Sequence, residues 1–249
     1  MKASIVIPTF NALHFTKRCL ASLRLTTRFP YEIIVVDNGS TDGTREFIES
    51  QKDVQLIKSD FNLGYAGACN LGIRSSDSKY VVISNNDIIF TPNWLSHLVD
   101  TSEVNESVGL VGPVTNHASG YHVQPFRPYK DNIGLFRESK RIYAENKGSY
   151  MFVPLLIFFC TLIKRKTIDT IGVLDPNLGL GGCDDLDYSF RNRMAGLASL
   201  LDLSVFVHHF CSKTYSSNDL DYWKLIKESI DRYNRKWEGI SRIGTPSNA

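Results

Sequence analysis

Several features that mark particular protein classes are scarce in this sequence of 249 residues. The five cysteines include no C-x-x-C pair, which argues against a structural zinc site, and their odd number argues against a disulfide framework. A reducing compartment such as the cytoplasm is therefore the simplest interpretation. The formal net charge is only +2, so charge gives no reason to expect nucleic acid as a partner.

Long hydrophobic runs are also missing from the sequence. The longest spans residues 151–163, contains Pro154, and is too short for a transmembrane helix, which needs about 20 residues. We interpret residues 152–163 as a buried strand. The weaker alternative is an apolar surface beside a lipid-linked molecule, with peripheral association at the inner face of a membrane. Residues 1–5 lead directly into a strand pattern, so we expect no signal peptide.

The first 112 residues alternate between short apolar runs and helical patterns. The apolar runs lie at residues 4–7, 33–36, 54–57, 80–83 and 108–111. This alternation predicts an α/β fold with a doubly wound, mostly parallel, Rossmann-like central sheet. The strands are almost continuously apolar, which is typical of a sheet covered by helices on both faces.

The pattern changes after Pro113. Residues 115–150 are polar and aromatic without a clear period, and we expect an irregular segment that is functional or mobile. A helix at 185–195 follows a glycine-rich loop, with Leu186, Phe190 and Met194 on its expected inner face.

The last element is an amphipathic helix over residues 220–237. Its apolar stripe consists of Leu220, Trp223, Ile226, Ile230, Tyr233 and Trp237. Such a stripe must be covered, and we expect it to dock on the core; a homodimer surface is the alternative.

Short clusters that contain polar side chains follow the predicted strands at the points where they end. Asn85, Asn86 and Asp87 follow one strand, Pro8, Thr9 and Phe10 close another, and Asp37 and Asn38 close a third. In an open α/β sheet the ligands bind at the carboxyl ends of the strands. Amide and carboxylate oxygens there suit a divalent cation. The alternative is that these residues only form turns, in which they are common.

Two further clusters carry titratable groups. Asp184 and Asp185 begin the helix behind the glycine-rich loop, and crowded carboxylates allow one to be tuned as a proton acceptor. His208 and His209 close a strand, where an imidazole can bind a metal. Helix capping and structural hydrogen bonds are the alternative roles.

In this order the clusters resemble those of the family 2 glycosyltransferases, which are inverting, nucleotide-sugar-dependent enzymes with the GT-A fold. The resemblance covers about residues 3–112 and 152–215. Its motifs are Ile5-Val6-Ile7-Pro8-Thr9-Phe10-Asn11, Val35-Val36-Asp37-Asn38-Gly39-Ser40, Asn62-Leu63-Gly64 with Asn70-x-Gly72, Asn85-Asn86-Asp87, and Asp184-Asp185-Leu186-Asp187 with Arg191.

The resemblance implies how a UDP- or dTDP-sugar donor would be bound. Asp37 would read the uracil or thymine edge, and Asn86 would lie near the donor sugar and diphosphate. Asp87 would bind Mn²⁺ or Mg²⁺, with His209, or alternatively His208, as a further ligand. The remaining residues implied in the donor pocket are Pro8, Thr9, Phe10, Asn38, Gly64, Asn70 and Asn85.

The resemblance also implies a catalytic base and an acceptor region. Asp185 matches the catalytic base of the family, which is the second acid of a Glu-Asp pair. The first acid of that pair is Asp184 here instead of a glutamate, so Asp184 is the alternative base. The sequence Asn85-Asn86-Asp87 departs from the family's D-x-D, so one metal carboxylate is missing. The acceptor would be a saccharide, a lipid-linked saccharide or a protein-linked glycan.

We expect one domain over residues 1–249. It would comprise a nucleotide-sugar half (1–112), an acceptor and catalytic half (113–215), and a C-terminal helix with a tail (216–249). The expected acceptor wall and lid is 115–150, whose aromatic residues could stack on sugar rings or fill a small core. The rival functions are a catalytically silent glycan- or nucleotide-binding module and a sugar-phosphate nucleotidyltransferase.

Overall fold

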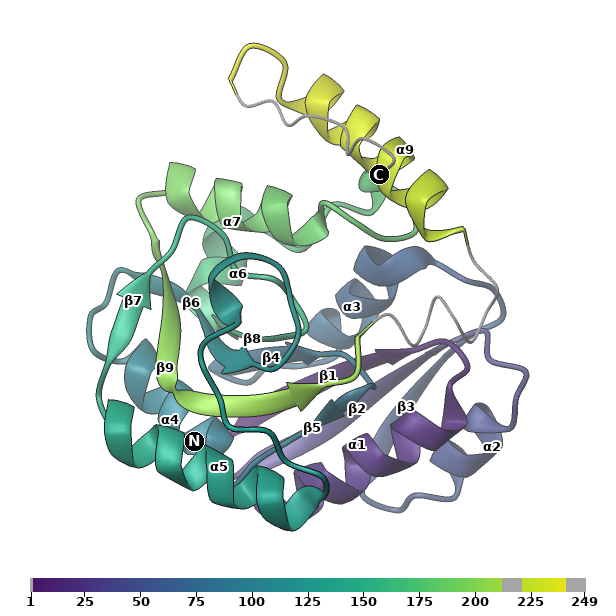
Figure 1. Ribbon diagram of the computed structural model, residues 1–249. Coiled ribbons are helices and arrows are strands. Elements are labelled where there is room, and N and C mark those ends of the chain that lie inside the picture. Colours follow the sequence, from purple (N-terminus) through teal and green to yellow (C-terminus); the bar gives the residue numbers. More distant parts are fainter. Residues whose placement is uncertain (1, 212–220, 241–249) are drawn as a thin grey trace.

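A central β-sheet covered by helices organises the chain (Figure 1). The computed structural model describes residues 2–211 and 221–240. The strands are β1 (Ala3–Thr9), β2 (Tyr31–Asn38), β3 (Val54–Ser59), β4 (Tyr80–Ser84), β5 (Ile88–Ile89), β6 (Val108–Thr115), β7 (Tyr150–Phe152), β8 (Cys160–Lys164) and β9 (Ala198–His209). The helices are α1 (Leu13–Thr26), α2 (Thr44–Glu49), α3 (Gly64–Arg74), α4 (Trp94–Ser102), α5 (Asn132–Asn146), α6 (Arg165–Ile171), α7 (Asp184–Met194) and α9 (Tyr222–Lys236), with 3₁₀ turns η1 (Gly120–His122) and η2 (Pro176–Leu178).

The sheet runs in the order β3-β2-β1-β4-β8-β6-β9-β5, and β7 pairs with β9. The four N-terminal strands are parallel to one another, and so are β6 and β9. Strand β8 is antiparallel to both of its neighbours, β4 and β6. The parallel register places Thr9 beside Asp37, so the polar ends of β1 and β2 lie at one edge of the sheet. Residues distant in sequence are thereby brought to one site.

Two apolar cores lie on the two faces of this sheet. Alternation along β1 sends Ile5 and Ile7 into one core and Val6 into the other. Helices α1 and α4 cover the first face, and α3 and α7 contribute to the second. No helix of the described ranges has both the length and the apolar character needed to cross a bilayer.

Residues 115–150 correct our expectation of an irregular segment, because they contain the 15-residue helix α5. Its N-terminus is capped by Asp131, whose carboxylate accepts a hydrogen bond of 2.8 Å from the Gly134 amide. Leu135 and Ile142 face the core with spacing typical of a helix. We missed this period because the buried face also carries the polar residues Glu138 and Ser139.

Three of the aromatic residues before α5 pack inside the protein, whereas Tyr121 is exposed. Phe126 and Tyr129 both lie against Phe206 of β9, with ring centroids 5.7 and 6.1 Å away. His122 is buried, and Pro113 and Ile157 bond its two ring nitrogens. Of the two roles left open for these aromatics, core packing is the one that these three adopt.

Our prediction of a continuous strand over 152–163 was also wrong. The segment contains the end of β7 and most of β8, joined by residues 153–159 that are not in strand conformation. Pro154 lacks the amide hydrogen that a central strand needs, which explains the break. The apolar character comes instead from burial, since Leu156, Phe158 and Phe159 are at most 3% exposed.

The inner face of α7 differs from the prediction as well. Phe190 is buried, but Met194 is 63% exposed. The buried side chains include Tyr188, Ser189 and Asn192, because the face is rotated toward polar residues that bond neighbouring segments. In the C-terminal helix, Ile230 and Tyr233 are buried as expected, Trp223 is 60% exposed, and Leu220 lies outside the described residues.

Candidate active site

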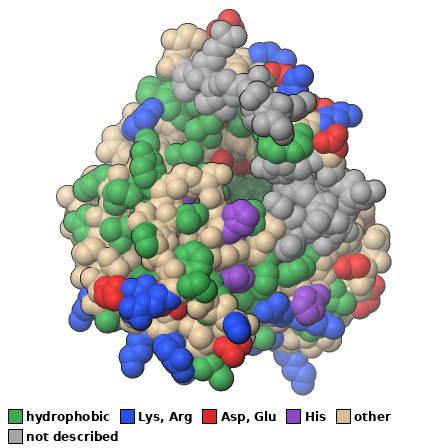
Figure 2. Space-filling view, viewed as in Figure 1, with side chains coloured by type: hydrophobic (Ala, Val, Ile, Leu, Met, Phe, Trp, Pro, Cys, Tyr) green, Lys and Arg blue, Asp and Glu red, His purple; other side chains and the backbone are tan. Residues whose placement is uncertain are grey.

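A cavity of about 500 Å³ opens where the ends of β1, β2, β4 and β9 meet α9 and the loop before α7. Figure 2 shows the molecule hollowed near its centre, with histidine side chains beside the hollow. The predicted residues that line it are Pro8, Thr9, Phe10, Asn38, Asn85, Asn86, Asp184, Asp185 and His209. Most of the predicted site thus comes together around one space. This agrees with the rule that ligands of open α/β sheets bind at the carboxyl ends of the strands, which we call the strand-end rule.

The floor of the cavity is held by hydrogen bonds between strand ends. The Asn86 side-chain amide donates to the hydroxyls of Thr9 (3.0 Å) and Thr16 (2.9 Å), and Asn86 is almost completely buried. The Asn38 amide donates to the Asn62 side-chain oxygen (2.8 Å), and the Asn38 oxygen accepts from the Leu63 amide (2.9 Å). These bonds fix the shape of the cavity wall before any ligand enters.

Gly64 belongs to the predicted set but is not among the lining residues, and close packing explains it. Its φ of +74° is one that few other residues adopt, and an added Cβ would lie 2.9 Å from the backbone of Gly179 and Leu180. The Tyr65 amide also donates to the Leu180 carbonyl over 2.9 Å. The start of α3 therefore supports the loop that leads to the α7 carboxylates.

Asp37 and Asn70 are engaged with protein groups and do not line the cavity. Both carboxylate oxygens of Asp37 accept hydrogen bonds, one from Arg45 Nε at 2.6 Å and one from the Ser40 amide at 3.2 Å. The Asn70 side chain bonds the Leu174 carbonyl (2.8 Å) and amide (3.0 Å). A hydrogen bond between Asp37 and the edge of the nucleotide base stays a prediction. A contact between Asn70 and the nucleotide also stays a prediction.

The geometry around Asp87 and His209 fits a cation. His209 Nδ1 lies 3.0 Å from the His117 carbonyl, so Nδ1 carries the hydrogen and Nε2 presents its lone pair. Nε2 faces Asp87 Oδ1 at 3.2 Å, and this buried oxygen has no hydrogen-bond partner. Two lone pairs that face each other need a shared proton or a cation between them. Asp87 is only 3% exposed.

His208 is placed differently from its neighbour. Successive residues of a strand point to opposite faces, and His208 Nδ1 bonds the Tyr129 hydroxyl at 2.7 Å. Burial lowers the pKa of His208 to about 4. The described residues include no group of three or more His, Cys, Asp or Glu side chains placed to hold a metal ion. A cation here would need further oxygens from its ligand.

The two carboxylates of α7 stand at the other side of the cavity. Cys183, with a left-handed φ of 64°, precedes the helix and turns the chain so that both Asp184 and Asp185 reach the cavity. Burial raises the pKa of Asp185 to about 6. Asp184 is 4% exposed, and burial together with the Asp185 charge raises its pKa well above its usual range.

Further residues that line the cavity, or that support a lining residue, were not predicted from the sequence. Phe159 stacks on the His209 ring with a centroid distance of 5.1 Å, and the Asn116 side chain bonds both the amide and the carbonyl of His209. Leu225 and Ile226 enter from α9. These residues come from irregular segments or a distant helix, where the strand-end rule gives no signal.

The fold is of the GT-A type, and the following two solved structures share it. A mannosyltransferase from Pyrobaculum calidifontis, solved with GDP-Man and Mn²⁺, is 20% identical with a TM-score of 0.65 and covers 98% of this chain and 65% of that one. GalNAc-T7, solved with UDP, GalNAc and Mn²⁺, is 16% identical with a TM-score of 0.71 and covers 96% of this chain and 48% of that one. The predicted fold class is confirmed.

The particular family follows from the sequence. Residues 4–172 match the model of glycosyl transferase family 2, and the chain belongs to that family. An N-acetylglucosaminyl-diphospho-decaprenol L-rhamnosyltransferase of Mycobacterium tuberculosis is 30% identical over 235 residues, which cover 82% of this chain and 75% of that protein. An uncharacterized glycosyltransferase of Rickettsia bellii is 26% identical over 212 residues, which are 80% of this chain but 28% of that longer protein.

Proposed function

We propose that this glycosyltransferase moves a sugar from a UDP- or dTDP-sugar to a hydroxyl group, with inversion at the anomeric carbon. The observation that carries the proposal is that Asp185 and His209 line one cavity of about 500 Å³, with Asp87 lying 3.2 Å from His209. The candidate base and the histidine of the candidate cation site thus line the same space, and Asp87 lies directly behind that histidine. This arrangement suits a leaving diphosphate and an attacking alcohol.

The donor would extend across the ends of β1, β2 and β4. The nucleoside would lie against Phe10, Asn38 and Asn62, and the diphosphate near His209, which also lines the cavity and contacts Asp87. Asp87 and His209 would hold Mn²⁺ or Mg²⁺, with diphosphate oxygens completing the coordination. When bound, the cation would supply positive charge that stabilises the departing diphosphate.

Asp185 would act as the catalytic base. In this step the acceptor oxygen forms a bond to the anomeric carbon, the bond from that carbon to the diphosphate breaks, and the hydroxyl proton passes to the Asp185 carboxylate. A base whose pKa is about 6 is ionised at neutral pH and accepts a proton readily. Asp184 is the alternative base, but it is only 4% exposed, and burial raises its pKa well above its usual range.

We favour a lipid-linked saccharide as the acceptor, in bacterial polysaccharide or glycoconjugate synthesis. The cavity has an apolar wall made of Leu180, Leu225 and Ile226, which suits a hydrophobic neighbour of the acceptor sugar. The Mycobacterium relative is named for a decaprenol-linked acceptor. Such an acceptor would place the protein at the cytoplasmic face of a membrane.

A ligand screen tests the proposal. Thermal unfolding is followed with UDP-glucose, UDP-N-acetylglucosamine, dTDP-L-rhamnose and GDP-mannose, each with and without Mn²⁺. The expected result is Mn²⁺-dependent stabilisation by a UDP- or dTDP-sugar, together with slow hydrolysis of that sugar. Binding without hydrolysis would favour a silent binding module, and preference for GDP-mannose would overturn the donor assignment.

A further inference from the structure

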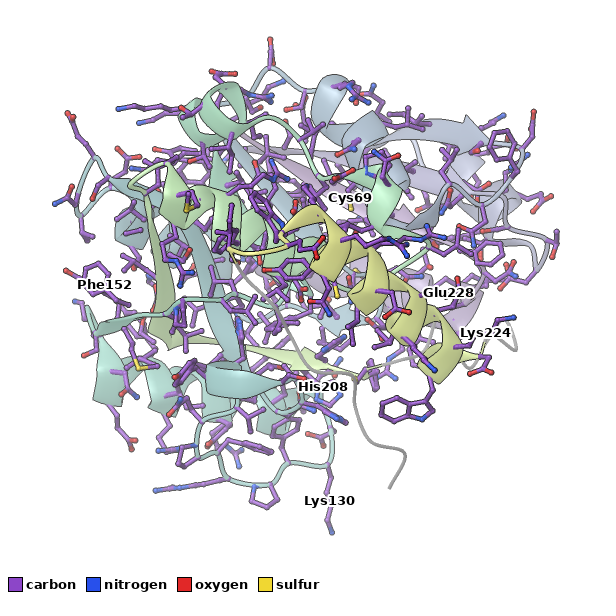
Figure 3. All side chains as sticks on the ribbon, turned by 90° about the horizontal axis from the view of Figure 1, so that it is seen from above. Cys69, Lys130, Phe152, His208, Lys224 and Glu228 are labelled. Atoms are coloured by element: carbon purple, nitrogen blue, oxygen red, sulfur yellow. The ribbon has the colours of Figure 1, made fainter. Side chains whose placement is uncertain are left out.

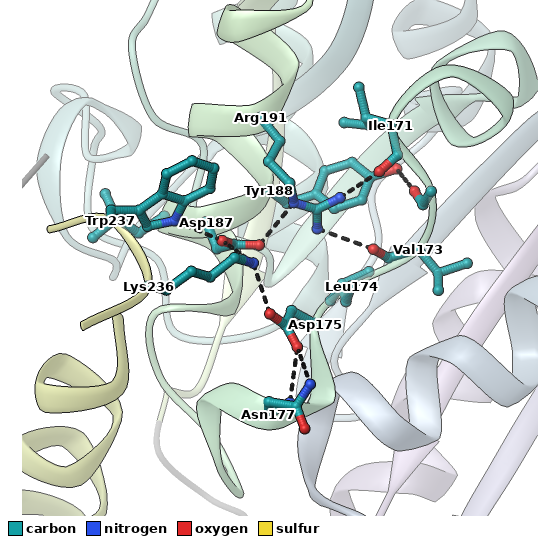
Figure 4. Close-up of polar contacts among 12 residues, drawn as sticks. Ile171, Val173, Leu174, Asp175, Asn177, Asp187, Tyr188, Arg191, Lys236 and Trp237 are labelled. Atoms are coloured by element: carbon teal, nitrogen blue, oxygen red, sulfur yellow. Dashed lines mark hydrogen bonds and ion pairs between the residues drawn. The ribbon is translucent and has the colours of Figure 1, made fainter. Parts of the chain in front are cut away.

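The contacts of α9 converge on one buried carboxylate near the start of α7 (Figure 4). Asp187 is completely buried, and its Oδ2 accepts a hydrogen bond of 2.8 Å from Arg191 Nε. Its Oδ1 lies 2.7 Å from Lys236 Nζ and accepts a hydrogen bond of 2.9 Å from Trp237 Nε1. Two of the three donors therefore come from the end of α9, about 50 residues later in the chain.

Asp187 belongs to the same helical turn as the candidate base. Its amide donates to the Cys183 carbonyl over 2.8 Å, which closes the first turn of α7 around Asp184 and Asp185. A buried carboxylate costs free energy unless it is fully paired, so the positions of its partners fix where this turn lies. The Phe190 and Trp237 rings pack edge to face, with centroids 4.7 Å apart, and support the same contact.

The loop before α7 is held by the same helix. Lys236 also binds Asp175 at 2.7 Å, and the Ser229 hydroxyl donates to the Gly181 carbonyl over 3.0 Å. Ile226 lies so close to Gly182 that an added Cβ there would be 2.6 Å from its Cδ1. Figure 3, seen from above, shows α9 lying across the molecule.

This loop has an unusual backbone that its surroundings support. Gly179, Gly182 and Cys183 all have positive φ, which for Cys183 is a conformation that non-glycine residues rarely adopt. The start of α3 contacts the loop at Leu180, and the contacts with α9 support it at the beginning, middle and end of the segment 175–187. The last of them is adjacent to the carboxylates that face the cavity.

We propose that Lys236 and Trp237 are positioning residues for sugar transfer. By binding Asp187 they hold the first turn of α7, and this directs the Asp185 carboxylate toward the acceptor hydroxyl. The inference rests on the proposed role of the α7 carboxylates. Neither residue touches substrate in this account, and a misplacement of the base by about 1 Å can reduce the rate by about 100-fold.

The test compares Lys236→Met and Trp237→Phe with a matched control on the same helix, Arg235→Met, whose side chain is exposed. The readouts are kcat and KM for hydrolysis of the best donor with Mn²⁺, the Kd of UDP from calorimetry, and hydrogen–deuterium exchange of residues 179–187. Lys236→Arg tests rescue.

We expect kcat to fall by about 10- to 100-fold in both test variants, while KM and the UDP Kd change less than twofold. Exchange of residues 179–187 should accelerate in Lys236→Met but not in the control, and Lys236→Arg should recover part of the activity. Unchanged exchange, unchanged kcat, or equal losses in kcat and UDP binding would each overturn the proposal.

Asp185→Asn and Asp184→Asn are measured in parallel. If both remain active, the base assignment in the proposed function fails, and the exchange data still decide whether α9 holds the loop. If Asp185→Asn is inactive while Lys236→Met turns over normally, only the positioning role fails.

Discussion

Asp184 and Asp185 are adjacent in the chain, but the fold gives their carboxylates different surroundings. Asp185 is half-buried at the cavity, and its Oδ1 accepts a hydrogen bond of 2.8 Å from the Leu186 amide. Asp184 is almost fully buried, and its Oδ1 has no hydrogen-bond partner. Two neighbouring acids in such different surroundings are well suited to divide catalytic and structural roles.

The pH dependence of turnover should report Asp185. Burial raises the pKa of Asp185 to about 6, so below that pH the carboxyl is protonated and cannot accept the acceptor proton. With saturating donor and Mn²⁺, kcat should fall about tenfold per pH unit below roughly pH 6. Stopped assays between pH 4.5 and 8.5 measure this fall in kcat. A kcat that does not change with pH across that range would exclude Asp185 as the base.

Asp184→Asn should stabilise the protein at neutral pH. The pKa of Asp184 is raised in the folded state, so the folded protein prefers the protonated form. The resulting loss of stability is absent below the unfolded pKa of about 4 and grows as pH rises toward the folded pKa. The variant should therefore gain on the order of 1 kcal/mol, or about 2–4 °C in Tm, at pH 8.

The control for this substitution is the same comparison at low pH. Near pH 4 the wild-type carboxyl is protonated in the folded state and about half protonated in the unfolded state, so most of the penalty is absent and the two melting temperatures should approach each other. A gain of equal size at pH 4 and pH 8, or a loss at pH 8, would contradict the raised pKa of Asp184.

Among the individual residues, those at strand ends were the most predictable from sequence. Asn86 and His209 lie where the period-two and strand-end rules place them. Asn70 was harder, because its bonds to Leu174 connect residues 104 positions apart. The pairing of Asp37 with Arg45 likewise depends on the position of the next helix, which sequence periodicity does not give.

At the scale of elements, most helices were predicted, but α5 was missed because its buried face carries polar residues. Helix α5 buries Glu138, which accepts hydrogen bonds from Arg141. The sequence of the inner face of α5 is therefore not continuously apolar. The Arg127 amide, from outside the helix, also donates to Glu138 over 2.6 Å, and no pattern within the helix indicates such a partner. Segment 153–159 is buried without being a strand, and hydrophobicity alone does not distinguish these two cases.

The packing of α3 on β1 gives a prediction at this scale. An added Cβ at Gly72 would lie 2.3 Å from Val6 Cγ1, and Val6 is completely buried. Gly72→Ala should destabilise the protein by about 1–3 kcal/mol through overpacking. This exceeds the gain in helix propensity of about 1 kcal/mol or less. Chemical denaturation measures the change in free energy of unfolding.

Val6→Ala is the matched partner for a double-mutant cycle. It creates space at the contact, so the double variant should be more stable than the sum of the two single effects predicts, by at least about 0.5 kcal/mol. Additive effects would show that Gly72 is not constrained by Val6.

At the scale of the whole molecule, the sheet order explains why distant residues share one cavity. Strand β9 returns beside β6 and pairs with β5, which brings His209 opposite Ile88, next to Asp87. Helix α7 begins at the far side of the same cavity, and α9 closes over it with Leu225 and Ile226. The order of these late elements could not be derived from local sequence patterns, although the class of fold could.

The most direct measurement is Mn²⁺-dependent binding of UDP and dTDP by calorimetry, combined with donor hydrolysis, in wild type, Asp87→Ala and Asp185→Asn. His208→Asn serves as a control for loss of a histidine that bonds Tyr129 instead. The account predicts that Asp87→Ala weakens nucleotide binding at least about tenfold with Mn²⁺, whereas Asp185→Asn keeps it and loses about 10²- to 10⁴-fold in hydrolysis. Unchanged binding in Asp87→Ala, or normal turnover in Asp185→Asn, would contradict it.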